Sequence, residues 1–301
     1  MSFFWMLVLI AAGVWIAAML DRLARAVLEK RPIGDFVTAP LTDGIALFAR
    51  QRTTTEHPDA VNWRLAPALY LGLAVAGISV VPLGRDTVPV DFEASIVLWG
   101  ACEALTVVAV FLHGWSANAP LPLIGAYRYV ATGLPVMLIS MFVLIAAALP
   151  AESLAVTAIV ESQTSVWNVL RQPLGLPLFL LLGLSLGLRG PFDYADSTDL
   201  AGGTSAEISG PHRAIWQLAR LAMLVSAAAL ASAVFLGGHL GPVLPGPVWL
   251  VVKTVFVLGL LIAAGHLLPR IPAPRMVTLL WVVLLPLSFA GLVLAGIEAL
   301  G

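Results

Sequence analysis

Four carboxylates fall within fifteen residues of one polar segment: Asp193, Asp196, Asp199 and Glu207. The three aspartates recur at every third position, so on a helical turn they would share a face, and their mutual repulsion would raise some of their pKa values. A solvated acidic loop explains the same spacing. A divalent-metal site is disfavoured, because neither histidine nor EF-hand spacing accompanies the aspartates.

Four further ionisable residues lie in or beside long apolar stretches: Glu93, Glu103, Arg220 and Lys253. Charges at membrane depth are costly, so they usually face a partner or a water-filled cavity. Glu103 is the clearest case, because burial favours the neutral form of a carboxyl group, and this suits a proton relay. A static ion pair of Glu103 with Arg220 or Lys253 is the alternative, and Glu93 fits the outer rim of its stretch.

A charged cluster follows the first apolar stretch, where Asp21, Arg22 and Arg25 would leave the membrane. By spacing alone these residues fit an interfacial anchor. Further on, residues 40–50 place apolar side chains on one helical face, which predicts a short amphipathic helix at the membrane surface. Such a helix could cover an opening for a lipid-soluble substrate, or it could be a plain surface helix.

The sequence offers no ligand set for a resident cofactor. Cys102 is the single cysteine, and the five histidines are scattered, so no zinc or iron–sulfur spacing exists. The nucleophile elbow, the Walker loop and the dinucleotide fingerprint are also missing. We therefore expect no metal and no cofactor bound by this chain.

The fold that positions these residues can be inferred from the amino-acid composition. Of the 301 residues, 60% are hydrophobic and 11% are charged, against about 45–50% and about 25% in typical soluble domains. The net charge of −1 supplies no basic surface for a nucleic acid. The composition excludes a soluble enzyme, a disordered chain and a nucleic-acid binder, and predicts an all-α, polytopic integral membrane protein.

A membrane span needs about 20 mostly apolar residues. We expect residues 1–301 to form one membrane domain with about eight transmembrane helices and charged cytoplasmic loops. The first apolar run lacks the basic start of a signal peptide, and residues 150–172 are too polar to span and fit an interfacial segment. We expect kinks at Pro135 and Pro286. The expected spans are 3–20, 65–83, 93–112, 122–149, 173–188, 214–236, 247–268 and 276–297.

Lysine and arginine are distributed unequally between the two sides. The loops after the first, third, fifth and seventh spans carry 12 of these residues, whereas the other side carries Arg85 and Arg171. By the positive-inside rule, the first group of loops is cytoplasmic and both termini face outward. Most of the candidate residues above therefore gather on the inner side.

Several segments resemble one known family. They are Gly-Trp-Ser-Ala-Asn at 114–118 with Gly-Ala-Tyr-Arg at 125–128, Pro-Phe-Asp at 191–193 with Glu-Ile-Ser-Gly at 207–210, and Trp-Leu-Val-Val-Lys-Thr at 249–254 with Leu-Pro-Arg-Ile-Pro at 268–272. In order and spacing they resemble the H-type subunit of bacterial NADH–quinone oxidoreductase, which belongs to the subunit-1 family of respiratory complex I. The resemblance covers nearly the whole chain.

The resemblance implies a place in the inner membrane, at the joint between a peripheral electron-transfer arm and a proton-pumping membrane arm. Expected partners are iron–sulfur subunits of the peripheral arm, antiporter-like membrane subunits, quinone as substrate, and the lipid bilayer. NADH, FMN and the iron–sulfur clusters would bind to other subunits. The chain would help to form the quinone chamber and would couple quinone reduction to proton translocation.

The resemblance also assigns roles to residues. Asp193, Asp196, Asp199 and Glu207, with Glu103 beside them, would carry the catalytic coupling of protons. A second set would line the quinone chamber, and a third would form ion pairs or relays. The chamber set is Arg22, Arg25, Asp43, Trp115 and Arg128, and the third set is Asp21, Arg220, Lys253 and Arg270.

The chain departs from the family pattern at some of these places. Met137 and Arg220 stand where the family has membrane-embedded carboxylates, and the basic segment after the first span is reduced to residues 30–34. The lost carboxylates and the basic Arg220 favour a second hypothesis, the anchor subunit of a membrane-bound hydrogenase or ferredoxin-linked complex without quinone. The intact segment 114–118 favours the quinone branch. A third hypothesis, an independent transporter, needs a midplane binding site, and the crowding of charge on one side argues against it.

Overall fold

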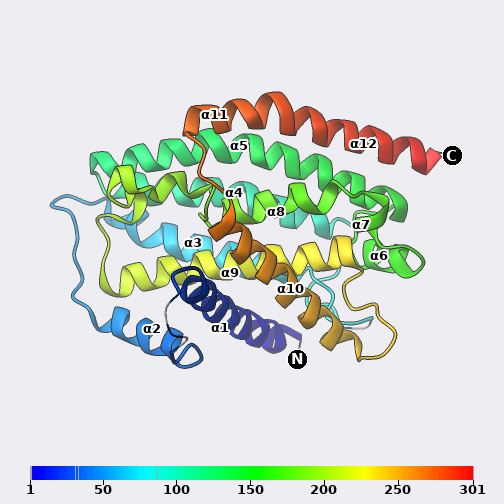
Figure 1. Ribbon diagram of the computed structural model, residues 1–301, viewed down its shortest axis with the longest axis horizontal. Helices are drawn as coiled ribbons and strands as arrows, with labels where there is room; N and C mark the ends of the chain where they lie inside the picture. The colour runs from blue at the N-terminus through cyan, green and yellow to red at the C-terminus, as the bar shows by residue number, and fades with distance from the viewer. Residues whose placement is uncertain (1, 31, 33, 86, 301) are drawn as a thin grey trace.

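The computed structural model describes residues 2–30, 32, 34–85 and 87–300, and Arg31 and Ile33 of the reduced basic segment lie outside these residues. The described residues form helices and no strand, so the all-α prediction is confirmed (Figure 1). The longer elements are α1 (Ser2–Leu28), α2 (Ala39–Ala49), α3 (Ala60–Ser79), α4 (Ser95–Ser116), α5 (Pro120–Ala148), α8 (Gly175–Leu186), α9 (Gly210–Leu236), α10 (Gly246–Leu267) and α12 (Leu285–Leu300). The shorter ones are η1 (Leu149–Ala151), α6 (Val156–Glu161), η2 (Ser162–Thr164), α7 (Asn168–Arg171), η3 (Asp193–Asp196), η4 (Thr198–Leu200), η5 (Gly203–Ser205), α11 (Ala273–Leu279) and the π-helical turn η6 (Leu280–Leu284).

Within the described residues, seven helices are long and apolar enough to cross a membrane. They coincide with seven of the eight expected spans. The fifth expected span, 173–188, is α8, which has 12 residues and reaches about 18 Å at 1.5 Å per residue. Pro173 stands just before this helix and Gly187 closes it, so α8 is shorter than the bilayer core of about 30 Å.

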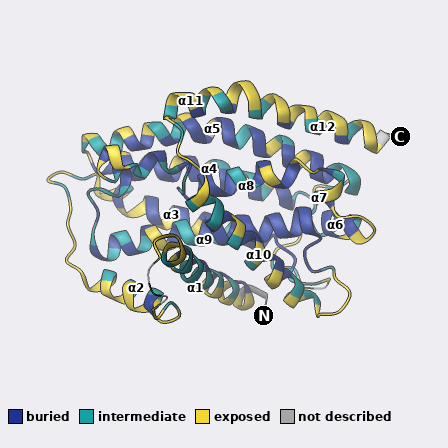
Figure 2. Cartoon of the chain, viewed as in Figure 1, coloured by how far each residue is buried: buried dark blue, intermediate teal, exposed yellow. Residues whose placement is uncertain are grey.

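Helix α9 is the centre of the bundle, and it packs against α1, α3, α8 and α10. Figure 2 shows it buried along most of its length, whereas α12, along one edge of the bundle, is largely exposed. Residues 222–236 of α9 are all buried, and many of them are alanine. Small side chains let neighbouring helices approach closely where the lipid supplies no hydrophobic driving force.

The first helix continues past its expected end at residue 20. Asp21 and Arg25 lie one helical turn apart near the end of α1 and form an ion pair. The charged cluster therefore belongs to the helix and not to the following loop. Helix geometry fixes the direction of these side chains, and a loop would not.

The polar segment 150–172 forms short helical turns that cover one end of the bundle. The side chain of Gln163 donates to the carbonyl of Ala233, and that of Asn168 donates to the carbonyl of Val234. The oxygen of Gln163 accepts from the backbone of Gly237. The last carbonyls of a helix lack hydrogen-bond partners inside that helix. The side-chain amides of Gln163 and Asn168 provide such partners at the buried end of α9.

The two prolines expected to kink their helices behave differently. Helix α5 runs unbroken through Pro135. The π-helical turn Leu280–Leu284 ends two residues before Pro286, where the missing proline N–H interrupts the regular ladder. An irregularity is therefore present at the second of the two expected kinks.

Candidate functional site

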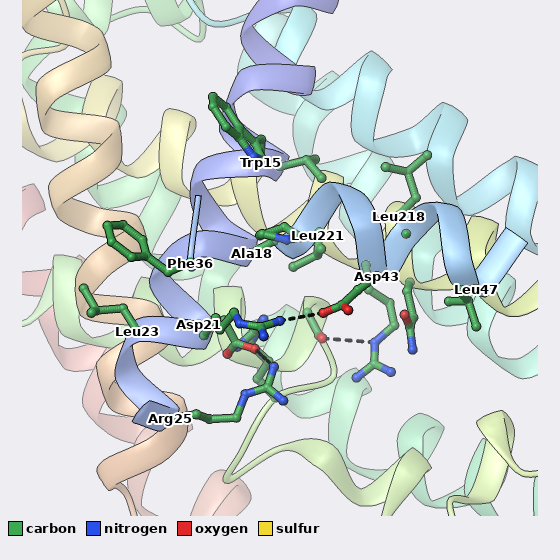
Figure 3. A pocket seen from close by; sticks show the side chains of 18 of the residues that line it. Trp15, Ala18, Asp21, Leu23, Arg25, Phe36, Asp43, Leu47, Leu218 and Leu221 are labelled. Carbon is green, nitrogen blue, oxygen red and sulfur yellow. Dashed lines mark hydrogen bonds and ion pairs between the residues drawn. The ribbon is translucent and has the colours of Figure 1, made fainter. Parts of the chain in front are cut away.

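A cavity of about 1360 Å³ opens between α1, α2, the start of α9 and the end of α10 (Figure 3). Its apolar wall comes from one face of α1 and one face of α9, and includes Trp15, Ala18, Leu218 and Leu221. Helix α2 forms a further wall with Leu47. The short helix predicted at 40–50 therefore exists as α2 and lines the cavity, whereas its apolar residues Leu41, Ile45 and Phe48 are exposed.

Away from the apolar wall, the cavity has a charged end in which Asp21 is the central residue. Its carboxylate accepts from Nη1 of Arg189 at 2.5 Å, lies 3.0 Å from Nε2 of His266 and pairs with Arg25. The three partners come from α1, from the loop after α8 and from the end of α10. One mostly buried carboxylate, with a side chain 12% exposed, thus joins three segments that are remote in sequence.

A second ion pair links α1 with α2. Nη1 of Arg22 lies 2.7 Å from Oδ2 of Asp43, and both side chains are well exposed. The indole of Trp15 donates to the carbonyl of Val37, just before α2, at 3.0 Å. These two contacts hold α2 against α1 along the cavity (Figure 3).

The charged end of the cavity is rich in guanidinium groups. Seven arginines and four carboxylates are among the described residues that line it. Polar ligands with electron-rich oxygens match such a lining, and the apolar wall suits an attached hydrocarbon chain. The arginines are Arg22, Arg25, Arg50, Arg189, Arg213, Arg220 and Arg270, and the carboxylates are Asp21, Glu29, Asp43 and Asp193.

Contrary to the expectation from their spacing, the three aspartates at 193–199 do not face one another. Asp193 pairs with Arg270, Asp196 with Arg220 at 2.5 Å, and Asp199 with Arg128 at 2.7 Å. The short turns η3 and η4 direct each carboxylate to a different arginine, so ion pairing replaces the predicted mutual repulsion. These arginines come from α5, from α9 and from the segment after α10.

The pKa values of two of these aspartates shift in opposite directions. Partial burial raises the pKa of Asp193, although the Arg270 charge opposes the shift. Hydrogen bonds from Ser197 and Arg128 lower the pKa of the exposed Asp199. The pKa values of the two carboxyl groups therefore depend on the local surroundings of each group and not on their regular spacing in the sequence.

The acidic loop is fitted tightly onto the bundle. A Cβ atom on Gly203 would lie 1.8 Å from the carbonyl oxygen of Ala195, and one on Gly125 of α5 would lie 2.4 Å from the same oxygen. Asp196 also accepts from Thr204 at 2.5 Å and from Ser205 at 2.9 Å. Glycine is required at both positions for this close approach, and the loop is held in one place beside Arg220.

Glu103 lies apart from the cavity, in the interior of the bundle. Its side chain accepts from Ser140, and its Oε2 has no hydrogen-bond partner among the described residues. The alternative of a static ion pair with Arg220 or Lys253 is wrong, because Arg220 binds Asp196, and Lys253 donates to the carbonyls of Leu236 and Leu240 at 2.6 and 2.7 Å. Both cations therefore have other partners.

The remaining predicted residues divide between the cavity and other surfaces. Trp115 packs against Phe111 with ring centroids 5.9 Å apart and does not line the cavity. Glu207 is half-buried in the acidic loop. The cavity brings together Asp21, Arg22, Arg25, Asp43, Asp193, Arg220 and Arg270, and it does not include Asp196, Asp199, Glu207, Glu103, Trp115, Arg128 or Lys253.

Two residues of the Asp21 cluster, Arg189 and His266, were missed by the sequence prediction. Arg189 follows the apolar helix α8 and His266 lies in the last turn of the apolar helix α10, and these positions were the available signal. The scattered histidines are also less isolated than predicted. His113 and His212 stack on each other at 5.4 Å, between Trp216 and Trp63. No group of three or more metal-ligating side chains occurs in the described part of the chain.

Comparisons with known proteins converge on one family. A model described as NADH dehydrogenase matches residues 1–296. The chain is 31% identical to the NADH-quinone oxidoreductase H-type subunit numbered 1 of Rhodopseudomonas palustris (strain BisA53) over 295 residues, 97% of this chain and 92% of that protein. It is 32% identical to the NADH-quinone oxidoreductase H-type subunit numbered 2 of Cereibacter sphaeroides (strain ATCC 17029 / ATH 2.4.9) over 263 residues, 87% and 83% of the two chains.

Proposed function

Because the chain belongs to the NADH dehydrogenase family and is a membrane subunit of the NADH–quinone oxidoreductase type, we propose that its large cavity forms part of the quinone chamber of such a complex. A quinone has a planar head with two oxygens and an isoprenoid tail. The cavity offers an arginine-rich end and an apolar wall that match these two parts. This two-part lining is the observation that carries the proposal.

The chain's own groups suggest how they would act on a bound quinone. Reduction by two electrons requires two protons, and guanidinium groups near the head stabilise negative charge that develops on its oxygens. Asp21 and Asp43 keep Arg189 and Arg22 oriented at the polar end. The redox centres, FMN and iron–sulfur clusters, would belong to partner subunits of the peripheral arm that dock on the inner loops.

The apolar wall provides a direct test of quinone binding. We expect Ala18→Phe to raise the KM for a quinone at least about tenfold, because the ring would occupy space beside Trp15 and Leu221. Electron transfer from NADH to a hydrophilic acceptor, which does not enter this cavity, should be unchanged. Both activities are measured on the assembled complex in membranes.

Ala12→Phe is the matched control, since Ala12 is exposed on the same helix and does not line the cavity. A normal KM in both variants would reject the cavity as the quinone site. A rise in both would show that α1 tolerates no bulk at all.

We further propose that Glu103 relays protons in this subunit. The carboxyl group is 1% exposed, and it retains an oxygen that no described residue binds. Buried polar atoms of this kind are commonly satisfied by internal water, and a carboxyl group with water beside it can accept and release a proton.

Glu103→Gln keeps the shape of the side chain and removes the titratable group. Quinone reduction should continue, whereas the proton flux through this site falls by about a hundredfold, so fewer protons cross per electron pair. Proton yield is measured in proteoliposomes during NADH oxidation. Glu93→Gln, at an exposed position, is the control, and an equal yield in all three proteins would contradict the relay.

The hydrogenase-type anchor remains the second candidate, favoured by Arg220 at a position where the family pattern has a carboxylate. The ion pair of Arg220 with Asp196 shows that this arginine holds the acidic loop. Identification of the co-purifying chains distinguishes the two candidates. A flavin subunit supports the NADH–quinone complex, and a partner with nickel ligands supports the hydrogenase anchor.

A further inference from the structure

A second cavity, of about 340 Å³, lies at the opposite end of the bundle from the large one. The loop after α3 contributes Gly84 and Arg85, and the turn between α9 and α10 contributes His239, Gly241 and Leu244. Nothing in the proposed function uses this cavity.

His239 is the most informative residue of this second cavity. It is 8% exposed, and neither of its ring nitrogens has a hydrogen-bond partner among the described residues. A buried polar group without a partner costs on the order of 1–3 kcal/mol, and such groups in folded proteins nearly always bind water or a ligand. Both ring nitrogens are themselves buried, so the imidazole lacks a partner directly beside the cavity that His239 lines.

The surroundings of His239 are positively charged. Arg85 is close enough to influence the imidazole electrostatically, as are Lys253 and the carboxylate of Glu161. No described carboxylate forms an ion pair with Arg85. Nζ of Lys253 is held by two backbone carbonyls and lies 4.5 Å from the ring of Trp167. With two cations against one carboxylate among these described groups, the cavity favours an anion.

The rim of the second cavity carries exposed apolar side chains. Leu244 lines the cavity and is exposed, and its chain neighbour Val243 is 82% exposed. This rim lies where α9 ends and α10 begins, both of them helices long enough to span a membrane. The depth is therefore that of the headgroup region, where an anionic ligand with acyl chains meets both kinds of surface.

From this arrangement we infer that the second cavity binds the phosphate group of an anionic phospholipid, with Arg85 and His239 as its ligands. Arg85 supplies a charge-assisted hydrogen bond, His239 supplies an N–H donor, and the apolar rim contacts the acyl chains. Free phosphate shares the headgroup chemistry but makes no use of the rim. This inference does not depend on the quinone chamber.

Binding should also depend on pH. Burial lowers the pKa of His239, and the charges of Arg85 and Lys253 lower it further, whereas Glu161 opposes them. A bound phosphate adds negative charge beside the imidazole and favours its protonated form. Binding therefore takes up a proton, and the affinity should rise as the pH falls.

A photoreactive phosphatidylglycerol applied to the delipidated complex tests the inference. Label should enter the peptides that contain residues 80–94 and 237–249. Unlabelled phosphatidylglycerol should compete better than phosphatidylcholine of equal chain length. Arg85→Gln and His239→Gln should each reduce labelling about tenfold, whereas Arg275→Gln, an exposed arginine at the other end, should not.

Each outcome of this experiment decides the inference. Label that is absent from these peptides, or unchanged in both site variants, overturns it. If inorganic phosphate competes as strongly as phosphatidylglycerol, the cavity is a phosphate site, and the inference that it binds a phospholipid is overturned. Labelling that weakens as the pH falls contradicts the role of His239.

Discussion

Asp21→Asn is expected to destabilise the protein by about 3–5 kcal/mol, the cost of removing one partner from a buried charge cluster. The carboxylate neutralises Arg189 and bonds to Arg25 and His266. The amide keeps the size but not the charge, so Arg189 would remain largely buried without a counterion. We expect a lower thermal midpoint of the purified complex and loss of quinone reduction.

Asp43→Asn is the matched control for Asp21. Its carboxylate also pairs with an arginine of α1, but the side chain is 71% exposed. An exposed ion pair contributes about 0–1 kcal/mol, so the thermal midpoint should hardly change. Equal effects of the two substitutions would show that burial does not set the importance of Asp21.

Arg220→Gln should release the acidic loop from the bundle. Arg220 pairs with Asp196, and its Nη2 donates to the carbonyl of Leu188 at 2.7 Å. Its removal leaves Asp196 mostly buried with only hydroxyl partners, at a cost of about 3–5 kcal/mol. Limited proteolysis should then cut within residues 189–209, and quinone turnover should fall.

Arg128→Gln provides the comparison for Arg220, because it also removes the partner of an aspartate in the same loop. The pair of Arg128 with Asp199 is much more exposed, and its loss should cost about 0–1 kcal/mol. Protection of the loop in Arg220→Gln would contradict the role given to that ion pair.

Hydropathy predicted the positions of the long helices because each span must bury its backbone polar groups internally. The expected segment 214–236 is α9 (Gly210–Leu236), and 247–268 is α10 (Gly246–Leu267). The hydropathy prediction was wrong at α8, because apolar composition alone does not reveal that this helix has only 12 residues. Other helices surround α8, so its length need not match the bilayer.

The ion-pair partners of the charged residues were not predicted. The regular spacing of Asp193, Asp196 and Asp199 suggested that they interact with one another, whereas each binds an arginine far away in the sequence. Asp21 and Arg189 are 168 residues apart. Such pairs depend on how the helices pack, and a single sequence does not contain that information locally.

The structure of the assembled complex with a short-chain quinone tests the central claim most directly. We predict quinone density in the large cavity, with the tail along Trp15 and Ala18 of α1 and the head toward Arg22 and Arg189. Density for the quinone at a site that this cavity does not reach, with the cavity occupied by lipid or a partner side chain, would contradict it.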